Sequence, residues 1–334
     1  MHRFLLRNIL LALACLAVVT GCSSTKQAID RTLAFHPIHE TRMSNHAQDG
    51  YVPTSVWRIR GIHNTVYLVG TSHIVSKDQI PFPSSLYAAY HDSQIVYHEF
   101  DTDLSWFAKM RLMPQMFRWV KSHELLAPKG KTLTNYLSTE TIEQLNQRYK
   151  RDFKQQRCTP LFLLFMNEAD MLDSKEKPTG VEEPFEILAR RDGKPLRELD
   201  DGSVIETAML MLDEMILGYQ RQIAQRGADA VVREALLSGK SNEDGDWRHG
   251  DLVAVERMQE AMMKESPTIY EKALPERNRL WMHKLEPLLH QKKNAMVFVG
   301  IAHIGGKDGL LELLRSASFP AEQMHAVDRP TMSR

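Results

Sequence analysis

Residues 66–74 read Val-Tyr-Leu-Val-Gly-Thr-Ser-His-Ile, and residues 296–304 read Met-Val-Phe-Val-Gly-Ile-Ala-His-Ile. Each stretch is a continuous apolar run, followed by a glycine and, three residues later, by a histidine. A run that is apolar at every position, without alternation, indicates a strand buried on both faces. The repeat therefore predicts two buried strands, one from each end of the globular region.

The ends of these two runs predict a binding site. Gly70 and Gly300 are expected to let the backbone turn sharply as it leaves the sheet. Loops at the carboxyl ends of strands are where open α/β sheets place ligands, so His73 and His303 are expected to meet there. A single histidine after a strand is more often a structural hydrogen-bonding group, but duplication of the whole unit favours a shared role. Neutral imidazole is the commonest metal-binding side chain, which makes the pair a candidate metal site.

The elements around the two runs predict an α/β fold. Its central sheet combines the amino- and carboxyl-terminal sections, and a largely helical middle, about residues 103–270, forms an insertion or cap within one compact unit. The expected strands are 57–62, 66–69, 94–100, 196–199, 295–299 and 324–327. The expected helices include 84–91, 139–149, 161–172, 204–217, 228–237, 266–291, 308–316 and one that contains Trp247.

The amino terminus reads as a targeting segment. Residues 1–21 combine basic positions with an apolar stretch that is short for a membrane span, which is typical of a secretory signal peptide. It ends in Val-Thr-Gly-Cys, which resembles a bacterial lipobox with Cys22 as the lipidated first residue. An ordinary signal peptide with an incidental cysteine is the alternative. Residues 22–52 are then a lipidated flexible tether, and 53–330 the α/β domain.

Ser23, the three cysteines and the net charge give predictions about the protein's location, its disulfides and its partners. Ser23 after the lipidated cysteine favours, by resemblance to Gram-negative lipoproteins, the outer membrane, facing the periplasm. If Cys15 leaves and Cys22 is acylated, Cys158 has no disulfide partner. The formal net charge of the 334-residue chain is zero, so there is no global basic field to attract nucleic acid.

A carboxylate follows the next expected strand. Alternation at the end of that strand places Glu99 and Tyr97 on one face and His98 on the other. Glu99 could complete a two-histidine, one-carboxylate metal site, or it could act as the general base on a bound water. The structural alternative is a surface acid at the edge of a sheet.

A cation and an amide lie together in a later helix. Arg277 near the two histidines could bind a substrate carboxylate or stabilise an oxyanion, and Asn278 could orient it. A helix this rich in charged residues is more often simply solvated, so composition alone does not decide between the two.

These residues resemble the TraB/GumN family, which is related to the Tiki proteins. The likeness rests on the two repeats with Glu99 and extends over about residues 55–315. Weaker elements also match, namely Gly180-Val181-Glu182, Gly193-Lys194-Pro195, Trp247 with Gly250-Asp251, and Arg277-Asn278 with Trp281. Glu182 and Asp200 are further candidate site residues, at positions where the family more often carries an aspartate and a glutamate, respectively.

The resemblance implies a function. The family has two Gly-x-x-His motifs and a glutamate, and its Tiki branch consists of proteases that require manganese or cobalt. Wider kinship includes erythromycin esterases and a haem-binding lipoprotein, and TraB itself is linked to shutting down peptide pheromones. The leading hypothesis is therefore a lipid-anchored hydrolase of the bacterial envelope. It would use Mn, Co or Zn and act on a peptide or protein substrate. A binding lipoprotein for haem, metal or peptide, without turnover, is the alternative.

Overall fold

The structure is a computed structural model, and it describes residues 51–72, 82–99, 106–168, 180–200, 204–237 and 247–327. The predicted signal peptide, Cys22 and His73 lie outside these residues. The first strand begins at Tyr51, two residues before the predicted start of the domain. The boundaries of the signal peptide and tether stay predictions.

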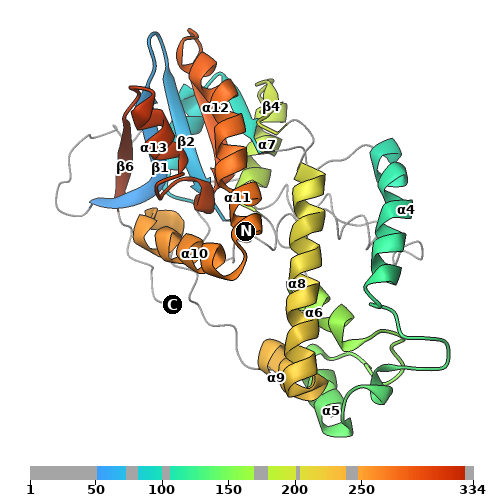
Figure 1. The fold of residues 1–334 in the computed structure, drawn as a ribbon. Coiled ribbons are helices and arrows are strands. Elements are labelled where there is room, and N and C mark those ends of the chain that lie inside the picture. Colours follow the sequence, from blue (N-terminus) through green and yellow to red (C-terminus); the bar gives the residue numbers. More distant parts are fainter. Residues whose placement is uncertain are drawn as a thin grey trace. The chain divides into compact units, whose positions relative to one another are not determined.

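Six strands form one mixed sheet in the described part of the chain (Figure 1). Their order is β4-β3-β5-β2-β1-β6. Strands β4, β3, β5 and β2 run parallel, whereas β1 pairs antiparallel with both β2 and β6. The bounds are β1 Tyr51–Arg60, β2 Thr65–Thr71, β3 Ile95–His98, β4 Leu196–Glu198, β5 Ala295–Gly300 and β6 Ala321–Val327.

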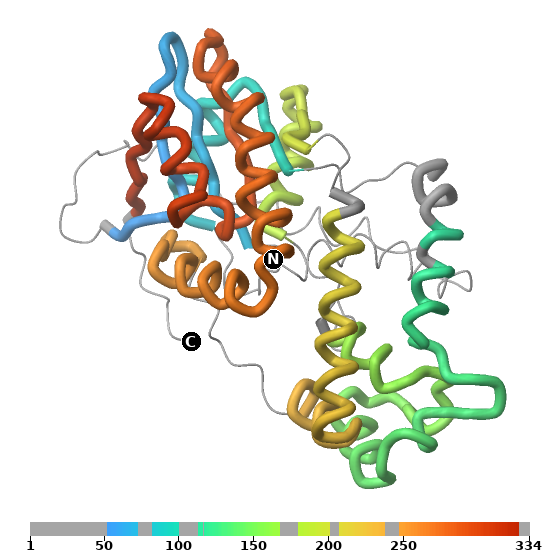
Figure 2. Tube along the Cα trace, viewed as in Figure 1, coloured from blue at the N-terminus to red at the C-terminus, as the bar shows by residue number. Residues whose placement is uncertain are grey.

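The two repeated runs are neighbours at the centre of the sheet. Strands β2 and β5 pair in parallel, with Val66 opposite Ala295 and Thr71 opposite Gly300. The first and last described parts of the chain, blue and red in Figure 2, also run side by side as β1 and β6. The prediction that the two ends of the sequence share one α/β sheet is therefore confirmed.

Helices cover both faces of this sheet. Side chains of β2 and β5 alternate between two apolar cores. Leu68 packs with Val297 and Trp281 in one core, whereas Tyr67 and Phe298 belong to the other. The first core faces α12 (Pro275–Leu289) and α13 (Leu310–Ser316), and the second faces α3 (Ser84–Asp92) and α7 (Glu182–Arg191).

This double burial explains why the strands are apolar at every position. Each fully buried aliphatic side chain contributes about 1.5–3 kcal/mol relative to an exposed one. The sheet is thus a rigid support for whatever follows its carboxyl ends.

The chain divides into two compact units, so the prediction of one compact unit is wrong. The described helices of the second unit are α4 Trp106–Ser122, η2 Leu133–Asn135, α5 Thr139–Tyr149, α6 Pro160–Glu168, α8 Val204–Arg226 and α9 Ala228–Leu237. They enclose a core of their own around Ile142, Leu164 and Val232. The largely helical middle of the sequence is confirmed in this unit.

Two helix predictions near the site need correction. The helix expected at 266–291 is broken at Leu274 into α11 (Pro267–Ala273) and α12, because Pro275 starts a new helix at its first position. Trp247 lies in a short 3-10 turn, η3 (Trp247–His249), and α10 (Leu252–Glu265) begins only after it. Among the described residues, no helix is both long and apolar enough to cross a membrane.

Candidate active site at the carboxyl ends of the strands

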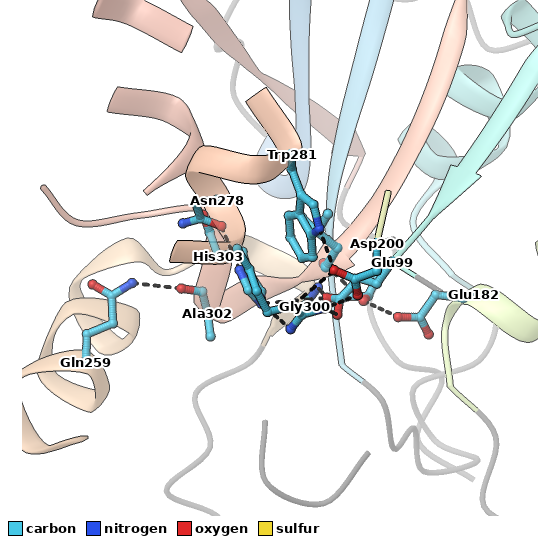
Figure 3. A network of polar contacts seen from close by, with 12 residues as sticks. Glu99, Glu182, Asp200, Gln259, Asn278, Trp281, Gly300, Ala302 and His303 are labelled. Carbon is cyan, nitrogen blue, oxygen red and sulfur yellow. Dashed lines mark hydrogen bonds and ion pairs between the residues drawn. The ribbon is translucent and has the colours of Figure 1, made fainter. Parts of the chain in front are cut away.

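Four chain segments deliver side chains to one edge of the sheet (Figure 3). Glu99 directly follows β3, and Asp200 follows β4. His303 ends η4 (Ile301–His303), the turn that follows β5. Arg277 comes from the first turn of α12, which packs over the same edge. The cluster therefore forms where a parallel sheet is expected to place a ligand.

Arg277 is the centre of this cluster. Its Nη2 donates to Glu99 Oε2 at 2.7 Å and to Asp200 Oδ2 at 2.7 Å. The other oxygen of Glu99, Oε1, accepts the backbone N–H of Gly300 at 2.6 Å. Arg277 is 3% exposed, so the alternative of a solvated helix face does not hold for this residue.

The hydrogen bonds around His303 define its tautomer. The Asn278 amide donates from Nδ2 to the carbonyl oxygens of Asp308 (2.8 Å) and His303 (3.3 Å), so its Oδ1 faces the imidazole. His303 Nδ1–H then donates to that Oδ1 at 2.7 Å. On the other side, Arg277 Nη1, which can only donate, lies 3.3 Å from His303 Nε2. His303 is therefore a neutral imidazole with its lone pair on Nε2.

Trp281 closes the cluster from within α12. Its indole N–H donates to Asp200 Oδ1 at 2.8 Å. Its ring lies 4.5 Å from the Arg277 Cζ and 4.4 Å, centroid to centroid, from the imidazole of His303. The spacing i, i+1 and i+4 puts Arg277, Asn278 and Trp281 on the buried face of the helix.

Burial shapes the electrostatics of the cluster. Two carboxylates share one guanidinium away from water, and burial raises the pKa of Asp200 above its ordinary value, with the charge of Glu99 adding to the effect. Burial opposes the charge of Arg277, yet Glu99 and Asp200 together raise its pKa. Arg277 therefore stays a cation and supplies the positive charge that both acids need.

The structure brings together five of the residues singled out from the sequence, namely Glu99, Asp200, Arg277, Asn278 and His303. Of these five residues, Asn278 is the one that orients the imidazole of His303. Its Nδ2 is held by the carbonyl oxygens of His303 and Asp308, and its Oδ1 accepts from His303 Nδ1–H.

Glu182, a further candidate from the sequence, and His98, which the alternation places on the other face, have hydrogen-bond partners outside this group of five. Glu182 comes from α7, where it accepts a hydrogen bond from Thr71 at the end of β2 (Figure 3). His98 points to the opposite face of the sheet, as the alternation predicts, with Nδ1 2.6 Å from Glu186 Oε1.

The role predicted for the two glycines is wrong. Gly70 lies inside β2, and Gly300 has a φ of −55°, which any residue can adopt. At Gly70 the reason is space, since an added Cβ would collide with Ile301 Cδ1 and lie 3.3 Å from Trp57 Cζ3. Gly70 thus allows the turn that carries His303 to pass close over β2, and Gly300 contributes its N–H to Glu99.

A divalent metal can be tested against these donors. Among the described residues, no group of three or more His, Cys, Asp or Glu side chains is placed to hold one. Glu99 Oε1 and His303 Nε2 lie 3.9 Å apart and fit by donor type, and His303 has the tautomer of a metal ligand whose second nitrogen is hydrogen-bonded. A third donor would come from outside the described residues. Arg277 Nη1, which now points at His303 Nε2, would have to move away so that the metal could bind this nitrogen.

A comparison with protein families gives one match. The sequence model of the TraB/PrgY/gumN family matches residues 55–323, which is most of the chain. The chain belongs to this family. No curated protein matches the sequence. In this TraB/PrgY/gumN chain, the Arg277-Asn278-x-x-Trp281 element lies in the candidate site. The Gly250-Asp251 element instead precedes α10, where Asp251 Oδ1 accepts hydrogen bonds from the N–H groups of Val253 and Ala254.

Two contributors to the site are not predicted from the sequence. In the sequence, Trp281 is singled out only because it matches the family's Arg-Asn-x-x-Trp element. Its spacing of four residues from Arg277 would also have predicted that the two side chains share one face of the helix. Gln259 in α10, which contacts Ala302 next to His303, carries no sequence signal, because its role depends on tertiary packing (Figure 3).

Proposed function

We propose that this protein is a hydrolase of the cell envelope and that Glu99, Arg277 and His303 form its active centre. The observation that carries the proposal is the position of Arg277: one guanidinium binds Glu99 and also faces the unprotonated Nε2 of His303. A carboxylate, a neutral imidazole and a fixed cation at the end of a sheet are the groups that hydrolysis needs.

The proposed roles follow from exposure and charge. Glu99 is 7% exposed and His303 is 0% exposed, so Glu99 is the group that a water molecule reaches first. In the proposal, Glu99 accepts a proton from the attacking water, and the same proton later goes to the leaving group. Arg277 donates N–H to the oxyanion that develops on the substrate carbonyl, and Asn278 keeps the imidazole in its orientation.

The proposal includes a divalent metal, Mn, Co or Zn, held by His303 and Glu99 with His73 as the third protein ligand. A bound ion of this kind lowers the pKa of a coordinated water towards about 7 and stabilises charge on a carbonyl oxygen. The substrate class that we propose, a peptide or protein, rests on the resemblance to the Tiki branch.

Hydrolysis of a peptide library by the purified protein tests the proposal. We expect cleavage that needs added Mn²⁺, Co²⁺ or Zn²⁺ and falls at least about a hundredfold in Glu99→Gln, because the variant removes both the proposed general base and a proposed metal ligand. His98→Gln is the matched control, since His98 lies on the opposite face of the same strand. Cleavage that survives in Glu99→Gln contradicts the proposed role.

The alternative is a binding lipoprotein without turnover. It is favoured by the closed hydrogen bonding of Glu99, Asp200 and Arg277, all of which are satisfied within the protein. Haem titration separates the two functions, because a Soret band that is lost in His303→Gln, together with no cleavage, supports binding.

The proposed location is the outer membrane, reached through a lipid on Cys22. Fractionation tests it: the wild type is expected with the membranes, and Cys22→Ser in a soluble fraction. A Cys22→Ser protein that stays with the membranes contradicts the lipid anchor.

A further inference from the structure

The loop that carries His303 is clamped by a side chain from a different helix. Gln259 of α10 is buried, and its Nε2 donates to the carbonyl oxygens of Ala302 at 2.7 Å and Gly305 at 2.9 Å (Figure 3). These two carbonyls lie on either side of His303 in the sequence. One amide therefore fixes the backbone both before and after the imidazole.

The loop is shaped around this amide. Gly306 has a φ of +82°, and a Cβ added there would collide with Gln259 Oε1. Only glycine permits both this backbone conformation and so close an approach. The glycine at position 306 is a second observation, separate from the two hydrogen bonds. Both show that the loop packs closely against the side chain of Gln259.

The start of α10 places Gln259. Asp251 caps the helix through its Oδ1, and Val255 and Gln259 form its buried stripe. The preceding Gly250 has a φ of +63°, and an added Cβ would lie 2.8 Å from Trp57 Cη2 and 3.0 Å from the carbonyl oxygen of Thr54. Gly250 and Asp251 thus fix the amino end of α10 against β1. Because α10 is a continuous helix from Leu252, this also fixes where Gln259 lies.

We propose that Gln259 is a positioning residue of the active centre, and that the Gly250-Asp251 element serves the site through it. By holding the carbonyls of Ala302 and Gly305, Gln259 keeps the imidazole of His303 in line with Asn278 on one side and Arg277 on the other. Gln259 does not touch the reacting groups. Its role in catalysis rests on the proposed function, whereas its control of His303 does not.

The test replaces the amide without changing its shape. Gln259→Met removes both donors, and Asn64→Leu is the matched control, because Asn64 Nδ2 also donates to two carbonyls, those of Leu288 and Lys293, at 3.0 and 2.8 Å. The full-length protein is studied without metal or substrate. Two signals are read: amide hydrogen exchange in residues 300–309, and the imidazole nitrogen resonances of ¹⁵N-histidine-labelled protein, with His303 assigned through His303→Gln.

We expect exchange in residues 300–309 to rise about tenfold in Gln259→Met, because two buried carbonyls lose their donor, and the His303 Nδ1–H signal to shift or broaden. Asn64→Leu should change neither signal. If Gln259→Met unfolds, Gln259→Lys, which keeps a donor at the end of a flexible chain, replaces it and should restore part of the Nδ1–H signal.

The inference is overturned if both signals in Gln259→Met match those in Asn64→Leu. Neither readout needs metal or turnover, so this failure is distinct from a failure of the hydrolase proposal. The hydrolase proposal would fail if the protein cleaved no peptide while the His303 signals still differed between Gln259→Met and Asn64→Leu.

Discussion

At the scale of single residues, Arg277 holds the charge balance of the site. It is the cation to which both Glu99 and Asp200 are bonded, and all three side chains are less than 8% exposed. Removing one partner of a buried ion pair leaves an uncompensated charge, which costs more than the pair contributes. The geometry of the site and the stability of the fold are therefore coupled at this residue.

We predict that Arg277→Gln lowers the free energy of unfolding by about 3–5 kcal/mol, because two buried carboxylates lose their counterion. Urea denaturation measures the change. Arg58→Gln, which breaks the pair of Arg58 with the half-exposed Glu322, serves as the control and should cost much less. Equal losses in the two variants would mean that the buried cluster is not a tightly coupled network.

Cys158 gives a prediction for the helical unit. Burial raises the pKa of its thiol to about 12. Since the thiolate is the reactive form, iodoacetamide should leave Cys158 almost unmodified at pH 8 in the native protein. The rate should increase with pH and become fast once the chain is unfolded in urea. Mass spectrometry of the Cys158 peptide measures the modification, and rapid labelling of native protein at pH 8 would contradict the burial of this residue.

The sequence predicts some of these residues better than others. Glu99 could be assigned to the site because a strand alternates and its last side chains fall on known faces. The tautomer of His303 could not, because it depends on an amide 25 positions away in the chain. Gln259 lies in a helix that is mostly exposed, so nothing in its local pattern marks it.

At the scale of elements, continuous apolar runs are the most reliable signal. β2 and β5 appear where they are expected because burial on both faces leaves no polar position to interrupt the pattern. Helix boundaries are less well predicted. Periodicity continues across Leu274, yet the helix breaks there, directly before Pro275, which is the first residue of α12.

The junction before α10 yields an element-scale prediction. Gly250→Ala should destabilise the protein by about 1–3 kcal/mol, because alanine is strained at a φ of +63° and its Cβ would meet Trp57. Gly218→Ala is the same change inside α8, where nothing lies within 4 Å, and it should stabilise by about 0.5–1 kcal/mol. Thermal denaturation compares the two. A neutral Gly250→Ala would show that the seat of α10 is not constrained as the structure indicates.

At the scale of the whole molecule, the site exists only because distant parts of the chain share a sheet. Glu99 and Gly300 are 201 positions apart in sequence and yet hydrogen-bonded. The parallel pairing of β3 with β5 supplies this connection, because it brings the carboxyl ends of these two strands side by side. The division into two compact units leaves every described residue of this cluster in the unit that contains the sheet.

The central claim is that Glu99 and His303 belong to one metal-dependent hydrolytic centre, and its most direct test is the metal content of the purified chain. Plasma mass spectrometry after exposure to Mn²⁺, Co²⁺ or Zn²⁺ should find about one ion per wild-type chain. The ion should be lost in His303→Gln and Glu99→Gln and kept in His98→Gln. A wild-type protein that takes up no metal, or a His303→Gln protein that keeps it, would contradict the account.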